Sequence, residues 1–359
     1  MKIVVEPRIY QNETLSSWLI RSSILNGSQP SDWANIIFDD NRIWNKDIDR
    51  FLPKEKLTKL SKVSSKTIEE LTDMTLEPLI QKIFKGEELN PKKSWTFVIS
   101  TGQRGSYKRN GTYFCPLCIE DDRNFHFRQE FRLAWNTSCY IHNIKLIQKC
   151  QKCNKNYTPN KVTYNNSNVY LCTNCGYDLR NSITEACNLE VLNFQTKLNK
   201  AIFNDIINEN FPLIEASTEE LFKTLRILLS FLRALFKTNK YELFLKQLNL
   251  SIPDNFLNAL VYSDSFEDMD TKTRDFFILI TSRVCDLKLD EIKSIFEELD
   301  FSYKLVVEQS TLTSKTIFYL AQSLKINSKQ RNNRLSKKEI LPKSADEVNK
   351  MIEELKLCL

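Results

Sequence analysis

Glycine is scarce in this chain, with only six among 359 residues. None lies in a GxxxxGKS/T or GxGxxG pattern, so loops that cradle the phosphates of a nucleotide are not expected. The hydrolase patterns HExxH and GxSxG are missing as well. No apolar run is long enough to cross a membrane, and the N-terminus has no apolar signal core. We therefore expect a soluble cytoplasmic protein with no membrane partner.

Basic residues cluster although the net charge of +6 is small. Lysines and arginines gather before the first cysteine pair, among the cysteines and near the C-terminus, and such clusters are candidates for contact with nucleic-acid phosphates. The three groups are Arg104, Lys108 and Arg109; Lys145, Lys149, Lys152, Lys155 and Lys161; and Lys325, Lys329, Arg331, Arg334, Lys337 and Lys338. A solvated surface explains each group equally well.

Eight residues of the types that bind zinc form four pairs, each with two residues between its members. The pairs are Cys115 and Cys118, Cys139 and His142, Cys150 and Cys153, and Cys172 and Cys175. Zinc takes four such ligands at tetrahedral corners, and one closely spaced pair supplies two of them. Disulfides are the alternative, but the expected compartment and the further Cys187, Cys285 and Cys358 disfavour them. The spacing thus predicts two Zn²⁺ per chain.

The simplest arrangement joins the pairs in chain order, which makes a site of three cysteines and one histidine and then a site of four cysteines. An interleaved arrangement, with the first and third pairs on one metal, stays open. Four protein ligands leave no position for a reactive water, so we expect structural metals and no enzyme. His126, between two phenylalanines, is expected to be structural. A zinc-dependent hydrolase is the competing hypothesis, and a water ligand on a cobalt-substituted site would support it.

The first hundred residues have the periodicity of short helices. The residues expected to face inwards are Leu15, Trp18, Leu19 and Leu25 in residues 14–26, Trp33, Ile36 and Ile37 after Pro30, and Leu57 and Leu60 after Pro53. Residues 53–71 follow the order helix, short turn, helix. This is the outline of a DNA-binding helix-turn-helix, although helical packing without DNA contact fits it too.

The last half of the chain is more strongly helical. Ser217 and Glu220 predict a capping box, followed by the apolar stripe Leu221, Leu225, Leu228, Leu229, Leu232, Leu235 and Phe236. Further helices are expected at residues 241–248, 253–262, 271–285, 289–299, 313–324 and 345–357. Between two of them, Asp264, Glu267, Asp268 and Asp270 lie in a loop without the ligand spacing of a calcium site. We expect this loop to be solvated.

These patterns predict a mainly α fold in three parts. Residues 1–91 would form an N-terminal helical domain of helix-turn-helix type, and residues 92–112 a linker with some strand character. Residues 113–182 would form a central double zinc-finger module. Residues 183–359 would form a C-terminal helical domain with a basic segment.

Several short sequence motifs resemble those of the TniQ family over about residues 5–180. They are Glu13 to Arg21 with Asn26-Gly27, Asp49 to Leu52, Leu71 to Leu76, Cys115-Pro116-Leu117-Cys118, Phe131 to Trp135, Cys139-Tyr140-Ile141-His142 and Cys150-Gln151-Lys152-Cys153. The resemblance implies a transposon target-selection protein that passes the choice of insertion site to an AAA+ ATPase regulator. Shorter members form a homodimer on a CRISPR RNA-guided Cascade complex with its guide RNA. Longer, TnsD-type members read an attachment site in DNA directly, which is the alternative.

Overall fold

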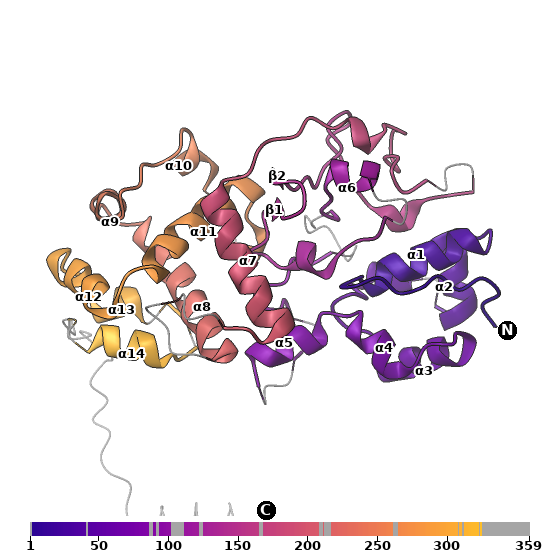
Figure 1. Cartoon of the computed structure of the whole chain (residues 1–359), viewed down its shortest axis with the longest axis horizontal. Coiled ribbons are helices and arrows are strands. Elements are labelled where there is room, and N and C mark those ends of the chain that lie inside the picture. Colours follow the sequence, from indigo (N-terminus) through magenta and orange to yellow (C-terminus); the bar gives the residue numbers. More distant parts are fainter. Residues whose placement is uncertain are drawn as a thin grey trace, which may run out of the picture. The chain divides into compact units, whose positions relative to one another are not determined.

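Helices dominate the part of the chain that the structure describes, where strands contribute only one short pair (Figure 1). The computed structural model describes residues 2–324 except 41, 86–88, 91–92, 102–110, 122–124, 165–167, 208–210, 212–216, 261–264, 308, 311 and 323. All of these described residues belong to one compact unit. The predicted mainly α fold is therefore confirmed, whereas the helix expected at residues 345–357 lies outside the described residues. Among the described helices, none is long and apolar enough to span a membrane.

The N-terminal helices enclose a core of their own. They are α1 (Leu15–Leu25), α2 (Pro30–Phe38), the 3-10 turn η1 (Ile43–Asn45), α3 (Lys54–Val63) and α4 (Ile68–Asp73). Thr14 caps α1 by accepting a hydrogen bond from the backbone N–H of Ser17. Trp18 and Leu60 are buried in this core, as predicted. Leu25, the last residue of α1, is 51% exposed and Ile36 is 54% exposed, so the expected burial of both is wrong. On α2, Trp33 and Ile37 face inwards, and Ile36 lies outside the buried face.

The next helix, α5 (Glu77–Ile83), packs into a second and larger core. Trp95, Phe97, Val98 and Ile99 are buried there too, although they lie in the segment expected to be a linker. Val98 forms a bridge with Leu133, which accounts for the strand character of this segment. The described part of the segment is therefore packed against the rest of the chain. The division into domains stays a prediction.

The cysteine-rich region consists of short turns rather than long elements. It contains α6 (Pro116–Asp121), η2 (Gln129–Arg132), β1 (Ser138–Cys139), β2 (Ile144–Lys145), η3 (Pro159–Lys161) and η4 (Leu179–Asn181). β1 and β2 are antiparallel, with Cys139 opposite Ile144. Phe114, Tyr157 and Leu179 form a small buried core beside the last two cysteine pairs. Little core is available here, so the tight turns need another source of stability.

The C-terminal helices surround α8. They are α7 (Leu189–Asn204), α8 (Thr218–Leu235), α9 (Tyr241–Gln247), α10 (Phe256–Ala259), η5 (Phe266–Asp268), α11 (Thr271–Cys285), α12 (Leu289–Glu298), α13 (Tyr303–Val306) and α14 (Lys315–Ala321). α8 contacts α5, α11, α13 and α14. Its predicted apolar stripe is entirely buried. A long amphipathic helix buried on this face is the centre of the larger core.

Two carboxylates in this half have partners that the sequence did not predict. Ser217 caps α8, but the Glu220 carboxylate does not complete the box and instead accepts hydrogen bonds from Ser314 and from the backbone of Thr316. Glu267 is 6% exposed rather than solvated. It accepts hydrogen bonds from the backbone of Phe97 and from Arg226, at 2.7 and 2.8 Å. Each carboxylate thereby ties two distant segments together.

Candidate metal centres

The eight predicted ligands come together in two groups of four. Cys115, Cys118, Cys139 and His142 form the first centre, and Cys150, Cys153, Cys172 and Cys175 form the second. Within each group, the ligand atoms all lie within 4.8 Å of one another. The pairs therefore join in chain order, and the interleaved arrangement is not formed.

The distances within each group suit a tetrahedral zinc. Zinc–sulfur bonds of about 2.3 Å place two sulfurs about 3.8 Å apart. The Sγ atoms of Cys118 and Cys139 are 3.5 Å apart, and those of Cys153 and Cys172 are 3.7 Å apart. His142 directs Nδ1 towards the sulfurs, 3.4 Å from Cys118 Sγ. Both groups can hold a metal ion, and a zinc bound there would supply folding energy.

Backbone turns explain why the pairs converge. The N–H of Asn143, Asn154 and Gly176 donates to the carbonyl of the residue four positions earlier, which is the first ligand of each pair. All three residues have positive φ, between 54° and 69°. Asparagine and glycine tolerate this left-handed conformation best. The first pair differs, because Cys115 directly precedes α6 and accepts a hydrogen bond from the N–H of Ile119.

Asp121 is a functional candidate that the sequence reading missed. Its Oδ2 lies 2.8 Å from Nε2 of His142, the ring nitrogen that faces away from the sulfurs. A carboxylate in this place fixes the tautomer and the orientation of a metal-binding histidine. The signal available in the sequence was only an acid three residues after Cys118, which is too common to single out.

The thiols of the first centre influence one another strongly. Hydrogen bonds from Cys115 and then Cys118 lower the pKa of Cys139. Hydrogen bonds with Cys115 and Cys139, together with burial, raise the pKa of Cys118. Without a metal, the surrounding protein groups thus favour a state in which one of the three cysteines is a thiolate over a state in which all three are. A divalent cation among them reverses this preference, because it stabilises every thiolate that binds it.

A buried ion-pair network connects the first centre with the N-terminal helices. Arg132 donates to Asp49 through Nη1 at 2.7 Å and to Asp47 through Nη2 at 2.6 Å. Asp49 also accepts from the backbone N–H and the hydroxyl of Ser16, at the start of α1. Burial raises the pKa of Asp49, while the Arg132 charge opposes this shift. The network joins segments that are far apart in the sequence.

Residues 13–21 of the N-terminal part also make buried contacts, one of them to the segment around Phe127. Glu13 is buried and accepts hydrogen bonds from Ser17 and Arg21. The hydroxyl of Ser17 in turn accepts from the backbone N–H of Phe127. His126 is buried and stacks on Tyr10 with ring centroids 4.9 Å apart. This contact agrees with the structural role expected for His126.

The nucleic-acid contacts predicted outside the cysteine region all lie beyond the described residues. They are Arg104, Lys108, Arg109, Lys325, Lys329, Arg331, Arg334, Lys337 and Lys338. Their role stays a prediction. Of the lysines among the cysteines, Lys145 pairs with Glu185 at 2.8 Å.

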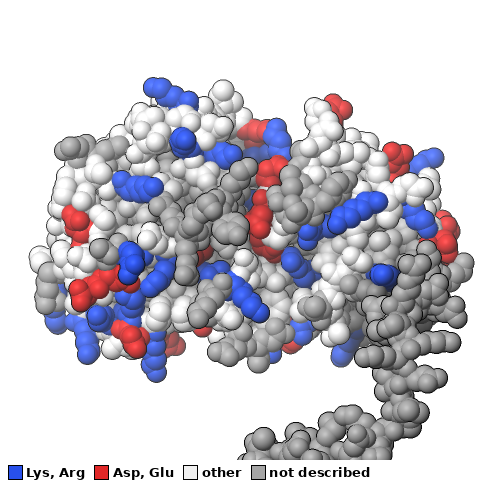
Figure 2. All heavy atoms as spheres, turned by 180° about the vertical axis from the view of Figure 1, so that it is seen from behind, with Lys and Arg blue, Asp and Glu red and all other residues white. Residues whose placement is uncertain are grey.

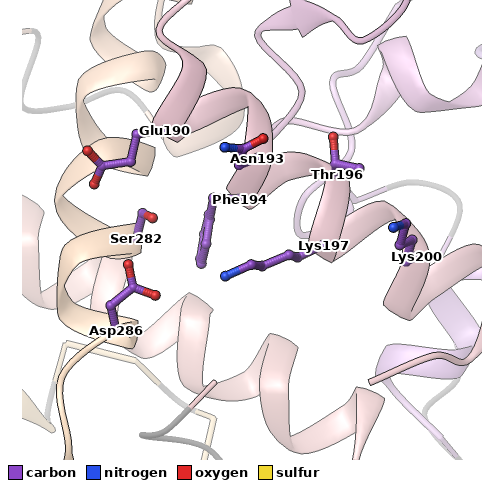
Figure 3. A pocket seen from close by; sticks show the side chains of 8 residues that line it. All are labelled: Glu190, Asn193, Phe194, Thr196, Lys197, Lys200, Ser282 and Asp286. Atoms are coloured by element: carbon purple, nitrogen blue, oxygen red, sulfur yellow. The ribbon is translucent and has the colours of Figure 1, made fainter. Parts of the chain in front are cut away.

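A hollow of about 550 Å³ lies between α7 and α11 (Figure 3). The residues that line it are Glu190, Asn193, Phe194, Thr196, Lys197, Lys200, Ser282 and Asp286. Figure 3 shows Lys197 extending across the hollow towards Asp286. Glu190 is already paired with Arg283 at 2.6 Å. With lysines and carboxylates mixed and no histidine or cysteine among these eight residues, the hollow has no evident arrangement of nucleophile and base.

A comparison with protein-family models finds one match, in the first part of the chain. Residues 4–146 match the TniQ family model. These residues form a TniQ domain. The resemblance inferred from the sequence motifs is thereby confirmed over this range. The TniQ match includes the first metal centre and ends before Cys150, so the second centre lies outside it. No curated protein matches the chain.

Proposed function

We propose that this TniQ protein is an adaptor that links a target-recognition complex to the AAA+ regulator of transposition. In this proposal, the recognition complex is an RNA-guided Cascade, and the adaptor acts as a homodimer. The TniQ match carries the proposal. The two four-ligand centres support it, because closed zinc shells stabilise surfaces and leave no coordination position for catalysis. We assign the eight ligands to two structural Zn²⁺ ions.

The charge of α4 favours an adaptor over a sequence reader. In a helix-turn-helix, the second helix enters the major groove, and here that helix is α4. Its first turn contains Glu69 and Glu70, both exposed, and its last residue is Asp73. Three carboxylates on so short a helix oppose its approach to DNA phosphates. The helix, turn and helix of residues 53–71 are therefore better explained by helical packing than by the reading of DNA bases.

A TnsD-type protein that reads an attachment site is the second candidate. Its possible reading element, residues 313–338, begins with α14 and continues into the predicted basic residues. On α14, Ile317 and Leu320 are buried, while Phe318 and Tyr319 are exposed. Two exposed aromatic side chains are more typical of a protein contact than of a phosphate contact.

Pull-down and footprinting separate the two functions. An adaptor recovers the ATPase and Cascade from a mixture of purified components and protects no discrete DNA sequence. A TnsD-type protein protects one sequence, and each base-reading side chain discriminates by about 1–3 kcal/mol. A Glu69→Gln, Glu70→Gln variant provides a control, because it should leave an adaptor's recovery of partners unchanged. Recovery of neither partner, together with a discrete footprint, would favour the second function.

A further inference from the structure

The two metal centres differ in how well their cysteines are enclosed. In the first centre, Cys115, Cys118 and Cys139 are at most 2% exposed and belong to the larger hydrophobic core. The one half-buried ligand of this centre is His142, which contains no sulfur. A reagent dissolved in water therefore meets no exposed cysteine at the first centre.

The second centre contains two partly exposed cysteines. They are Cys153 and Cys175, whereas Cys150 and Cys172 are buried. Each partly exposed cysteine has a buried one beside it. The Sγ atoms of Cys153 and Cys172 are 3.7 Å apart, and the same distance separates those of Cys175 and Cys150. An accessible cysteine next to a second one that can form a disulfide with it is typical of redox-sensitive sites, and the second centre has this arrangement twice.

The surroundings of the second centre are electropositive. The sequence contains no aspartate and no glutamate between Glu130 and Asp178. Three exposed lysines, Lys149, Lys152 and Lys155, flank the first ligand pair of this centre. Figure 2 shows the molecule from behind, where several blue side chains and few red ones lie over the cysteine-rich part. Reactive cysteines are typically found in such partly exposed and electropositive surroundings.

We propose that the second centre is a site of oxidation by hydroperoxides, at which two disulfides form and the metal leaves. The sulfur of Cys153 or Cys175 attacks one peroxide oxygen, so the O–O bond breaks, hydroxide leaves and a sulfenic acid forms. The neighbouring sulfur, of Cys172 or Cys150, then attacks the sulfenic sulfur, forms the S–S bond and displaces a second hydroxide. Each disulfide thus transfers two electrons from two sulfurs to one hydroperoxide, and two protons from the solvent convert both hydroxides to water. The zinc ion keeps its oxidation state and leaves, because it is bound by thiolates and not by disulfides.

Oxidation at the second centre leaves the first centre closed. The second centre lies beyond residue 146, where the match to TniQ ends. Its cysteines pack in the small core with Phe114, Tyr157 and Leu179, which is separate from the larger core that holds the cysteines of the first centre. Loss of the metal therefore loosens the turns around the second centre only. This inference goes beyond the adaptor role and does not depend on it.

Zinc release during treatment with hydrogen peroxide tests the proposal. The full chain is used with Cys187→Ser and Cys358→Ser, which remove two cysteines that are not metal ligands. A chromogenic chelator reports the zinc, and a sample without peroxide gives the rate of spontaneous release. One zinc should leave at least about tenfold faster than the other, because oxidation follows the exposure of the cysteines. The fast zinc should be accompanied by the loss of four thiols and the consumption of two peroxide molecules, as two disulfides require.

Peptide mapping after the fast phase identifies which centre has reacted. Disulfides should join Cys153 to Cys172 and Cys150 to Cys175, while the three cysteines of the first centre stay reduced. Dithiothreitol and added zinc should restore the second metal, because a disulfide is a reversible product. The proposal is overturned if both zinc ions leave at the same rate, or if the cysteines of the first centre are oxidised first.

Two variants exchange the chemistry of the centres. Cys153→His with Cys175→His replaces the partly exposed sulfurs by nitrogens that also bind zinc, so two zinc ions should stay bound and the fast phase should disappear. His142→Cys gives the first centre a partly exposed sulfur, and its zinc should then leave about as fast as that of the second centre. A fast phase that persists in the first variant, with two zinc ions bound at the start, also overturns the proposal. If that variant binds fewer than two zinc ions, the release rates and the disulfides of the chain with its eight natural ligands decide.

Discussion

Arg132 and Asp49 form a buried ion pair of 2.7 Å, with side chains only 4% and 7% exposed. The same guanidinium also donates hydrogen bonds to the carboxylate of Asp47 and to the backbone carbonyl of Ile99. Arg132, in η2, therefore joins the segment of Asp47 and Asp49 to the segment before the cysteines. All of these residues lie in the range that matches TniQ.

Replacing Arg132 by Met should destabilise the fold by about 3–5 kcal/mol, because it leaves two buried carboxylates without their cation. Urea unfolding of the zinc-saturated protein measures this loss. Arg283→Met is the matched control, since Arg283 is 44% exposed and pairs with Glu190 on the surface. Its loss should not exceed about 1 kcal/mol. Equal losses in the two variants would contradict the role given to Arg132.

Replacing Asp121 by Ala should weaken zinc binding at the first centre about tenfold, because His142 loses the carboxylate that orients it. The effect should lie at the low end of the known range, since Asp121 is 66% exposed. Competition with a chromogenic chelator reads the affinity of each centre. Asp178→Ala, near the second centre, is the control and should leave the first centre unchanged. An Asp121→Ala protein that holds zinc as tightly as the wild type would rule out the orienting contact.

Replacing Gly176 by Ala should destabilise the second centre by about 1 kcal/mol, because φ is 69° there. A methyl group at this position meets no atom within 4 Å, so backbone strain is the sole cost expected. Asn154→Gly tests the converse. It should be tolerated, since Asn154 has the same left-handed conformation with φ of 54°. The rate of zinc release to a chelator compares the two variants, and faster release from Asn154→Gly than from Gly176→Ala would refute the turn argument.

Replacing Glu130 by Gln should change stability with pH in a defined direction. Burial raises the pKa of Glu130, although Asn12 donates a hydrogen bond to it. A raised folded-state pKa means that the wild type is most stable below the unfolded pKa and loses this stability as pH rises through the folded value. Glu130→Gln should therefore gain on the wild type with rising pH, by at most about 1.4 kcal/mol per pH unit. Urea unfolding at several pH values above the unfolded pKa, with exposed Glu55→Gln as control, tests the sign.

Local patterns in the sequence were enough to predict most helices and which eight residues come together as candidate metal ligands. Two residues between ligands constrain a turn by themselves, and the structure groups all four pairs as the simplest arrangement expected. The left-handed Asn143, Asn154 and Gly176 each follow a pair directly, so the sequence also carries a local signal for these turns. The stripe on α8 was correct because one long helix determines its own buried face.

Contacts between distant segments could not be predicted in this way. Arg132 stands more than eighty residues from Asp47 and Asp49, and no periodicity links them. Glu267 was expected in solvent because its neighbours are acidic, yet the chain brings it to the backbone of Phe97, which has a positive φ of 66°. Ile36 has the right spacing for burial but lies past the edge of the buried face of α2. Such outcomes depend on how segments pack, which one sequence does not encode locally.

The zinc content of the purified chain, measured by native mass spectrometry, tests the central claim most directly. We predict two Zn²⁺ per wild-type chain and one per chain in both Cys118→Ser and Cys172→Ser, because each substitution opens one four-ligand centre. A wild-type chain with any other number, or a variant with both metals and an unchanged melting temperature, would contradict two closed structural centres.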